Sequence, residues 1–157
     1  MKILVTGGAG YIGTELVEQL VQDPEVEEVV VYDNLTRKNY NLFLFHDLPG
    51  AKVRFIEGDL LDSRRLRQVL ASVDTVIHLA ARVTTPFAAQ DPHYFEQVNH
   101  WGTAELVYAV EESPVQQFVY VSSGSVYGFS ESIRDEDSIP APKTYYGVSK
   151  RRGEEHV

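Results

Sequence analysis

The sequence predicts an α/β protein with a doubly wound parallel sheet of about five strands. Short apolar runs rich in β-branched residues alternate along the chain with longer segments of helical periodicity. These runs are apolar throughout instead of alternating with polar residues, as in strands that are covered on both faces. A glycine-rich turn joins the first run to the first helical segment. Nothing in the composition marks a boundary between domains, so residues 1–157 are expected to form one domain.

The elements follow in order along the chain. Strands are expected at 3–6, 29–32, 53–56, 76–79 and 118–121. The first helix carries apolar residues at helical spacing over Ile12–Leu20, and Ser63 is the expected N-cap of a second helix. A long helix is expected from about Pro92 to Glu112, and a last helix begins near Thr144. The remaining segments expected to be loops are 34–50 and 129–143.

Composition excludes several classes of function. The 157 residues include 14 Lys and Arg against 23 Asp and Glu, a net charge of −9, which disfavours nucleic acids and anionic membranes as partners. The absence of cysteine excludes disulfides, thiolate metal sites and cysteine nucleophiles, and no metal site is expected. No apolar run approaches the ~18 residues of a membrane span. We therefore expect a soluble cytoplasmic protein.

The turn after the first strand has the glycine spacing of a dinucleotide site. Glycines at 7, 10 and 13 permit a tight turn, the close approach of a pyrophosphate and close packing of helix on strand. The helix N-terminus then offers free N–H groups to the phosphates. A glycine-rich turn without a ligand is the alternative interpretation.

Two acidic residues follow the next strands. Asp33 ends the second strand, 20 residues after Gly13, where a carboxylate accepts hydrogen bonds from ribose hydroxyls and repels a 2′-phosphate. NAD is therefore expected in preference to NADP, although Arg37 and Lys38 nearby leave NADP open, as does a plain surface turn at Asp33. Asp59 after the third strand fits either an acceptor for the adenine amino group or a turn residue.

Hydroxyl and amine side chains gather near the end of the sequence. Tyr146 and Lys150 are four residues apart, which places them on one face of a helix. An ammonium group lowers the pKa of a nearby phenol, so that the phenol can exchange a proton with a substrate hydroxyl. Ser122, Ser123 and Ser125 follow the fifth strand, at the edge of the sheet where ligands bind. Serines are also common turn residues, and a solvated helix face is the alternative for the Tyr–Lys pair.

Taken together, these segments resemble the extended short-chain dehydrogenase/reductases, in the NAD-dependent epimerase/dehydratase branch that acts on nucleotide sugars. The matching segments are TGGAGYIG, VVVYDN, EGDL, HLAA at 78–81, VNHWGT at 98–103, VSSGSVYG and YYGVSK. The resemblance implies a Rossmann fold with strand order 3-2-1-4-5, bound NAD and a nucleotide-sugar substrate, expected to be a UDP-sugar. It also implies a chain of roughly twice this length. Residues 1–157 are accordingly expected to be the NAD-binding part of a longer enzyme, without its C-terminal strands and substrate domain.

The resemblance also implies roles for individual residues. Ser123 would bind the reacting sugar hydroxyl, Tyr146 would be the acid/base and Lys150 would lower the pKa of Tyr146. Asp59 and Leu60 would flank adenine, and Asn99 would orient the site. The full set of implied cofactor-binding residues is Gly7, Gly10, Tyr11, Ile12, Gly13, Asp33, Asn34, Asp59, Leu60, Leu79, Ala80, Ala81, Arg82, Asn99, Val121, Tyr146 and Lys150.

One departure narrows the branch. The 4,6-dehydratases of this family carry Asp and Glu where this chain has Gly124 and Ser125, so the chain looks more similar to the 4-epimerases. The alternatives are a non-catalytic NAD(H)-binding module and another activity of the family, such as a dehydratase, decarboxylase or reductase.

The long helix suggests a partner. Tyr94, Trp101 and Tyr108 recur every seven residues and are interpreted as a stripe facing a partner, with Phe95, Val98, Leu106 and Val110 toward the sheet. Cover of the aromatic residues by the chain's own loops is the alternative. Because the family's usual dimer uses this helix and the one with Tyr146, we expect a homodimer through the helices at 92–112 and 144–157.

Overall fold

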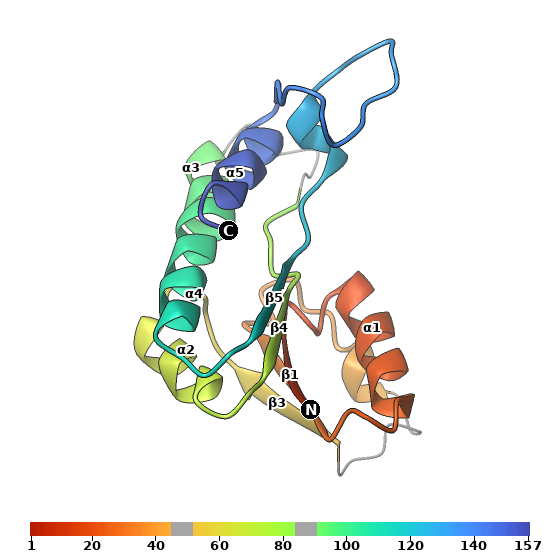
Figure 1. The fold of residues 1–157 in the computed structure, drawn as a ribbon, viewed down its shortest axis with the longest axis vertical. Helices are drawn as coiled ribbons and strands as arrows, with labels where there is room; N and C mark the ends of the chain where they lie inside the picture. Colours follow the sequence, from red (N-terminus) through yellow and green to blue (C-terminus); the bar gives the residue numbers. More distant parts are fainter. Residues whose placement is uncertain (45–51, 84–90) are drawn as a thin grey trace.

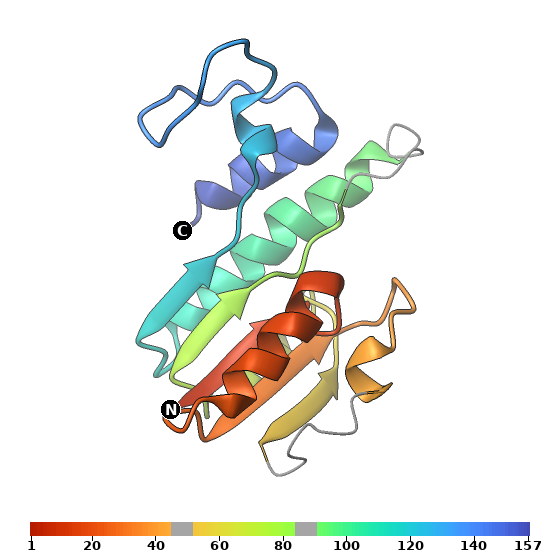
Figure 2. The same ribbon diagram turned by 90° about the vertical axis from the view of Figure 1, so that its right-hand side faces the viewer.

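The sheet has the predicted topology. The computed structural model describes residues 1–44, 52–83 and 91–157. Its strands are β1 (Lys2–Thr6), β2 (Glu28–Asp33), β3 (Val53–Glu57), β4 (Thr75–His78) and β5 (Gln117–Tyr120). They form one sheet in the order β3-β2-β1-β4-β5, and every pairing is parallel. Figure 2 shows the strands side by side with their carboxyl ends at the same edge. The predicted fold class and strand order are confirmed.

Helices cover the sheet on both faces (Figure 1). On one face lies α1 (Tyr11–Gln22). On the other lie α2 (Ser63–Leu70), the continuous run of α3 (Pro92–Phe95), η3 (Glu96–Trp101) and α4 (Gly102–Glu111), and α5 (Tyr145–Glu154). Short 3-10 turns occupy η1 (Asn41–Leu44) and η4 (Gly124–Tyr127). Within the ranges given above, no helix has the length and hydrophobicity needed to cross a membrane.

The two faces of the sheet have separate cores, which explains the uniformly apolar strands. Leu4 of β1 packs with Leu66 and Leu106 from α2 and α4. The next residue, Val5, packs on the other face with Val17 and its neighbours from α1. Because successive side chains of a strand point to opposite faces, both sets must be apolar. Each fully buried side chain of this size stabilises the fold by roughly 1.5–3 kcal/mol.

Two local predictions were wrong. Asp62, not Ser63, is the N-cap of α2, because its Oδ1 accepts a hydrogen bond from the Arg65 N–H at 3.0 Å. Both residue types cap helices well, so the sequence alone does not choose between them. The predicted loop at 34–50 contains the 3-10 turn η1, in which Leu42 is buried in the core beneath α1. Residues 45–50 of that loop lie outside the described ranges.

The long predicted helix is confirmed over Pro92–Glu111, but its middle turn, η3, is a π-helix. A π turn takes one more residue than an α turn, so it rotates the face that the following residues present. Tyr94 therefore leaves the predicted stripe, and its ring instead lies 4.8 Å from the guanidinium carbon of Arg82. Trp101, the last residue of η3, and Tyr108 on α4 are 55% and 49% exposed.

Candidate functional site

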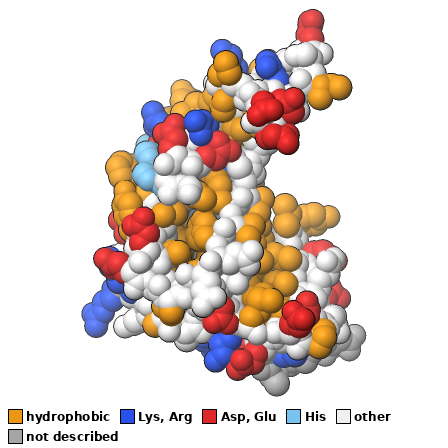
Figure 3. All heavy atoms as spheres, in the orientation of Figure 1, with side chains coloured by type: hydrophobic (Ala, Val, Ile, Leu, Met, Phe, Trp, Pro, Cys, Tyr) orange, Lys and Arg blue, Asp and Glu red, His pale blue; other side chains and the backbone are white. Residues whose placement is uncertain are grey.

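A cavity of about 700 Å³ lies at the carboxyl ends of the strands, where the loops after β1, β2, β3, β4 and β5 converge with α5. On the face drawn in Figure 3, the molecule is hollowed above the N-terminal end of α1, and hydrophobic side chains are exposed in the hollow. The predicted site residues that line the cavity are Gly7, Gly10, Tyr11, Ile12, Gly13, Asp33, Asn34, Asp59, Leu60, Leu79, Ala80, Ala81, Arg82, Val121, Tyr146 and Lys150. The structure therefore brings most of the predicted residues together around one cavity.

The three glycines of the turn meet different constraints. Gly7 has φ of +72°, and a Cβ there would lie 2.6 Å from the backbone N and Cα of Ala80. A Cβ on Gly13 would lie 2.5 Å from the Gly7 carbonyl oxygen, so close helix–strand packing requires this glycine. At Gly10 a Cβ would meet the Gly7 oxygen at 3.0 Å, its only contact within 4 Å among the described residues. Gly7 and Gly13 thus build the turn, whereas Gly10 opens on the cavity.

The N-terminus of α1 is suited to an anion. Gly10 is its N-cap and supplies no side-chain hydrogen bond, and the first turn holds no acidic residue. The first N–H groups of an α-helix have no partner within the helix, and the macrodipole adds positive charge there. The exposed end of α1, where Tyr11 is 89% accessible, therefore presents donors and a positive dipole to the cavity.

Asp33 and Asp59 are both fixed by backbone donors. The Asp33 carboxylate accepts hydrogen bonds from Ala9 N at 3.2 Å and Leu35 N at 2.8 Å, which places it against the glycine turn. Asp59 accepts from Leu61 N at 3.0 Å and from the Asn34 amide at 2.9 Å. Asp59 is therefore a turn residue that also lines the cavity, so both of its predicted roles remain compatible with the structure.

Tyr32 is a cavity residue that sequence reasoning missed. It is 1% exposed, and its hydroxyl donates to the Asp59 carbonyl oxygen at 2.8 Å. Burial raises the pKa of Tyr32 to about 12, so the hydroxyl keeps its proton and donates it to this hydrogen bond. A Cβ on Gly58 would overlap the Tyr32 ring, so the glycine makes room for this contact. An aromatic residue within an apolar strand carries no sequence signal of such a role. Val83 and Tyr94 are further lining residues that were missed, whereas Arg37 and Ser122, which also line the cavity, were noted in the sequence near the site.

Tyr146 and Lys150 lie on α5, whose start is set by Thr144 capping the Gly147 N–H at 3.0 Å. Both side chains line the cavity. Lys150 is 2% exposed, and its Nζ donates to the Val121 carbonyl oxygen at 2.6 Å. Burial lowers the pKa of Lys150 to about 8. Tyr145, the neighbouring phenol, is 55% exposed and is absent from the cavity lining.

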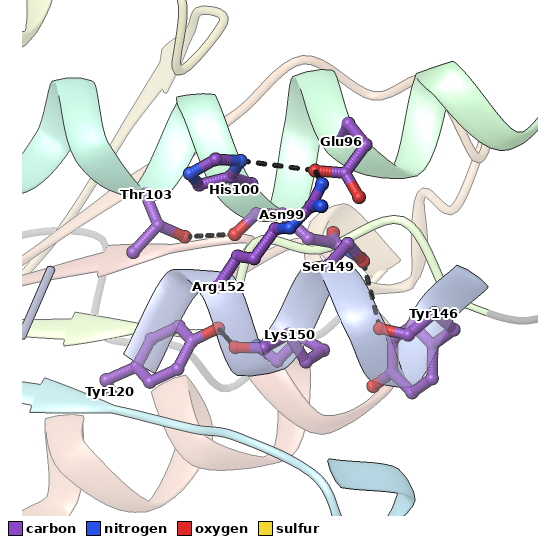
Figure 4. Close-up of polar contacts among 9 residues, drawn as sticks. All are labelled: Glu96, Asn99, His100, Thr103, Tyr120, Tyr146, Ser149, Lys150 and Arg152. Atoms are coloured by element: carbon purple, nitrogen blue, oxygen red, sulfur yellow. Dashed lines mark hydrogen bonds and ion pairs between the residues drawn. The ribbon is translucent and has the colours of Figure 1, made fainter. Parts of the chain in front are cut away.

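Asn99 does not line the cavity but fixes the loop that does. Its side chain is buried, accepts from Arg82 N at 2.6 Å and donates to the Arg82 carbonyl oxygen at 2.9 Å. It also donates to Ser149 Oγ at 3.0 Å, and Ser149 in turn donates to the Tyr146 carbonyl oxygen at 2.9 Å. Figure 4 shows Asn99 between the long helix and α5. One amide thus holds both the loop after β4 and the helix with Tyr146.

His78 extends this network across the sheet. Its Nδ1 lies 2.6 Å from Thr6 Oγ1 and its Nε2 lies 3.0 Å from Thr103 Oγ1. Because Thr103 donates its own proton to the Asn99 carbonyl oxygen, at 2.7 Å, it accepts from His78 Nε2–H. Thr6 then donates to Nδ1, and the imidazole is neutral. Complete burial, with a smaller contribution from Lys150, lowers the pKa of His78 to about 3.

Ser123, which follows the lining residue Ser122, is not itself among the residues that line the cavity. Its Oγ accepts from Ser125 N at 3.2 Å and caps η4. A Cβ on Gly124 would meet nothing within 4 Å among the described residues, so this glycine is not required by packing. Within those residues, no cluster of three or more His, Asp or Glu side chains is arranged to hold a metal ion.

Known proteins of similar sequence place the chain in a family. Residues 3–157 match the model of the NAD dependent epimerase/dehydratase family. The chain is 36% identical to a UDP-glucose 4-epimerase of Erwinia amylovora over 96% of its own length and 45% of the relative's. It is 33% identical to a dTDP-glucose 4,6-dehydratase of Streptomyces niveus over 98% and 47% of the two lengths.

Solved structures are similar as well. A UDP-glucuronic acid 4-epimerase of Bacillus cereus with NAD bound superposes with a TM-score of 0.89 at 30% identity, covering 99% of this chain and 51% of the other. A dTDP-glucose 4,6-dehydratase of Streptomyces venezuelae with NAD bound gives 0.89 at 33% identity, with 99% and 50% covered. The chain spans about half the length of these relatives. It belongs to the NAD dependent epimerase/dehydratase family.

Proposed function

We propose that the chain is the cofactor-binding part of an NAD-dependent nucleotide-sugar 4-epimerase. The observation that carries the proposal is the single cavity of about 700 Å³ that joins the glycine turn and Asp33 to Tyr146 and Lys150. Relatives from two branches of the family have structures with NAD bound, which supports the same cofactor here.

The residues present fit a dinucleotide. The open position at Gly10 and the uncapped N-terminus of α1 would hold the pyrophosphate, and the Asp33 carboxylate would accept from the adenosine ribose. Arg37 lines the same cavity, so a 2′-phosphate has a cation within the site as well. The negative Asp33, fixed against the glycine turn, favours NAD.

The chain's own residues supply the proton chemistry. A bound nicotinamide would supply a hydride acceptor at the sugar C4 and a donor for the return step. Tyr146 Oη takes the proton of the C4 hydroxyl and later restores it, and the Lys150 ammonium stabilises the phenolate form. Ser123 Oγ accepts a backbone N–H and still has its own proton to donate to the sugar oxygen.

The residues of one turn, Gly124 and Ser125, favour epimerisation over 4,6-dehydration. Elimination needs an acid and a base near the sugar C5 and C6 positions, and the chain has Gly124 and Ser125 where the dehydratases carry Asp and Glu. Relatives of both activities are equally similar in fold, so the residues of this turn favour the epimerase.

Cofactor binding is tested first. Titration with NADH, followed by its fluorescence, should show saturable binding that is weaker for NADPH. No binding at millimolar NADH would refute the proposal. A non-catalytic module would bind NADH but leave every sugar unchanged. Residues 1–157 alone should turn over little UDP-glucose in the presence of NAD, because the substrate domain belongs to the rest of the proposed enzyme. The longer enzyme should give the C4 epimer, which Tyr146→Phe abolishes, whereas a 4-keto-6-deoxy product would indicate the dehydratase.

We also propose a homodimer through the helices at 92–112 and 144–157. The exposed Trp101 and Tyr108 form an aromatic patch with His100 and His156. The rings of His100, on the long helix, and His156, just after α5, stack with centroids 5.2 Å apart. Sedimentation should show a dimer that Trp101→Glu converts to a monomer. Phe129→Glu is the control, because Phe129 is 87% exposed but lies on a distant loop. A monomeric wild-type chain would contradict the proposal.

A further inference from the structure

Lys150 is a cation in an unfavourable place. Its side chain is almost fully buried, and burial favours the neutral amine over the ammonium. Its Nζ nevertheless donates to the Val121 carbonyl oxygen and lies 4.0 Å from the centroid of the Tyr120 ring, an arrangement that suits an ammonium. Something nearby must offset the cost of this buried charge.

Three consecutive residues at the end of β5 hold α5. The Tyr120 hydroxyl donates to the Lys150 carbonyl oxygen at 3.2 Å, and Val121 accepts from Lys150 Nζ at 2.6 Å. Ser122 Oγ then donates to Glu154 Oε1 at 2.5 Å. Lys150 and Glu154 are four residues apart on α5, so their side chains share the face that meets the end of β5.

The groups facing Lys150 differ in charge. Tyr120 on β5 and Tyr146 on α5 are phenols, and His78 on β4 is neutral because burial lowers its pKa to about 3. Glu154 is an anion, and its charge raises the pKa of Lys150 against the effect of burial. Arg151 also contacts the Glu154 carboxylate, at 3.3 Å, through the oxygen that does not accept from Ser122.

We propose that Glu154 is a positioning residue for Lys150: its carboxylate, fixed by the Ser122 hydroxyl, keeps the buried side chain in the ammonium form and seated on the Val121 carbonyl. Ser122 lines the cavity, so its hydrogen bond to Glu154 connects the cavity wall to the helix that carries Tyr146 and Lys150. The consequence for catalysis rests on the function proposed above, in which the ammonium stabilises the Tyr146 phenolate.

The test is the ionisation of Lys150 itself. Its side-chain NMR signal, identified as the one lost in Lys150→Arg, is titrated in the full chain and in Glu154→Gln. Glutamine keeps an oxygen for the Ser122 hydroxyl and removes the charge, and its NH2 group replaces the oxygen that accepts from Arg151. The titration midpoint should fall by about one pH unit, so that at pH 8 the ammonium population drops roughly fivefold.

Glu155→Gln is the matched control, because it removes the same charge from the next residue, whose side chain is 58% exposed. Its midpoint should stay within about 0.2 of the wild-type value. Ser122→Ala, which frees the carboxylate without removing it, should lower the midpoint by a smaller amount and serves if Glu154→Gln does not fold. An unchanged midpoint in folded Glu154→Gln, or an equal shift in Glu155→Gln, would overturn the proposal.

NADH affinity as a function of pH is the second readout. Glu154→Gln should lose affinity at a pH about one unit lower than the wild type does and recover it below pH 6.5. A merely structural defect would lower affinity at every pH, and that result would count against the proposal. If the wild type binds no NADH, the proposed function fails while the Lys150 titration still decides this inference.

Discussion

Replacing Gly7 by Ala should destabilise the fold by about 2–5 kcal/mol. The backbone at Gly7 has φ of +72°, which costs a residue with a Cβ roughly 1–2 kcal/mol. The added Cβ would also lie 2.6 Å from the N and Cα of Ala80, and overpacking of this kind costs about 1–3 kcal/mol. Those atoms belong to the backbone after β4, so no side chain can rotate away.

Urea unfolding followed by far-UV circular dichroism measures this loss directly. Gly124→Ala is the control, because a Cβ there would meet no described atom within 4 Å and φ is not in the left-handed region. It should change the free energy of unfolding by less than about 0.5 kcal/mol. A typical domain has about 5–15 kcal/mol of stability, so the expected loss is a large share of the total and is easily measured. A loss below about 1 kcal/mol for Gly7→Ala would refute the reasoning.

Three further predictions follow from the same contacts. Gly10→Ala should lower the free energy of unfolding by no more than about 1 kcal/mol. It should weaken NADH binding at least tenfold, because the methyl group would fill the proposed phosphate position, and unchanged affinity in a fluorescence titration would contradict this. Asn99→Ala should cost about 2–4 kcal/mol in urea unfolding, since both backbone groups of Arg82 lose their partners; a loss under 1 kcal/mol would count against the assigned role. Because burial lowers the pKa of His78 from 6.5 to about 3, its contribution to stability is complete above pH 6.5 and decreases as the pH falls toward 3, by up to about 1.4 kcal/mol per pH unit. His78→Gln should flatten that slope between pH 4.5 and 6.5, and an equal slope in both proteins would be the contrary result.

The sheet was predictable because burial on both faces leaves a strong pattern. Val29, Val30 and Val31 are all fully buried, and each contacts a core on one face or the other. No predicted strand end differs from the observed one by more than one residue. The cavity was predictable for a related reason: in a parallel sheet the carboxyl ends of the strands meet at one edge, so motifs that follow the strands converge there.

Features that depend on tertiary contacts were not predictable. The π turn of η3 leaves no pattern in the sequence, yet it moves Tyr94 from the predicted aromatic stripe to the cavity beside Arg82. Asn99 was predicted to orient the site and to bind the cofactor. The sequence does not reveal its partners in the structure, Arg82 and Ser149, and cofactor binding by Asn99 stays a prediction. The cytoplasmic location, the homodimer and the catalytic roles of Ser123, Tyr146 and Lys150 stay predictions.

The polar network explains how the loop after β4 and the helix with Tyr146 are held in fixed positions around one cavity. The Ala80 N–H donates weakly to Thr6 Oγ1 at 3.4 Å, and Thr6, His78, Thr103 and Asn99 follow in one chain of hydrogen bonds. Each hydroxyl donates one proton and accepts another, so the direction of the whole chain is fixed by its backbone ends, the Ala80 N–H donor and the Asn99 carbonyl acceptor. Asn99 passes the constraint through Ser149 to the backbone of Tyr146. A buried network with every member satisfied holds its geometry closely, and the proposed transfer of a hydride from the sugar C4 and of a proton from its hydroxyl would require such geometry. The loop after β4 and the helix with Tyr146 are therefore held in a fixed relative position by side chains that need not touch the proposed cofactor or the sugar.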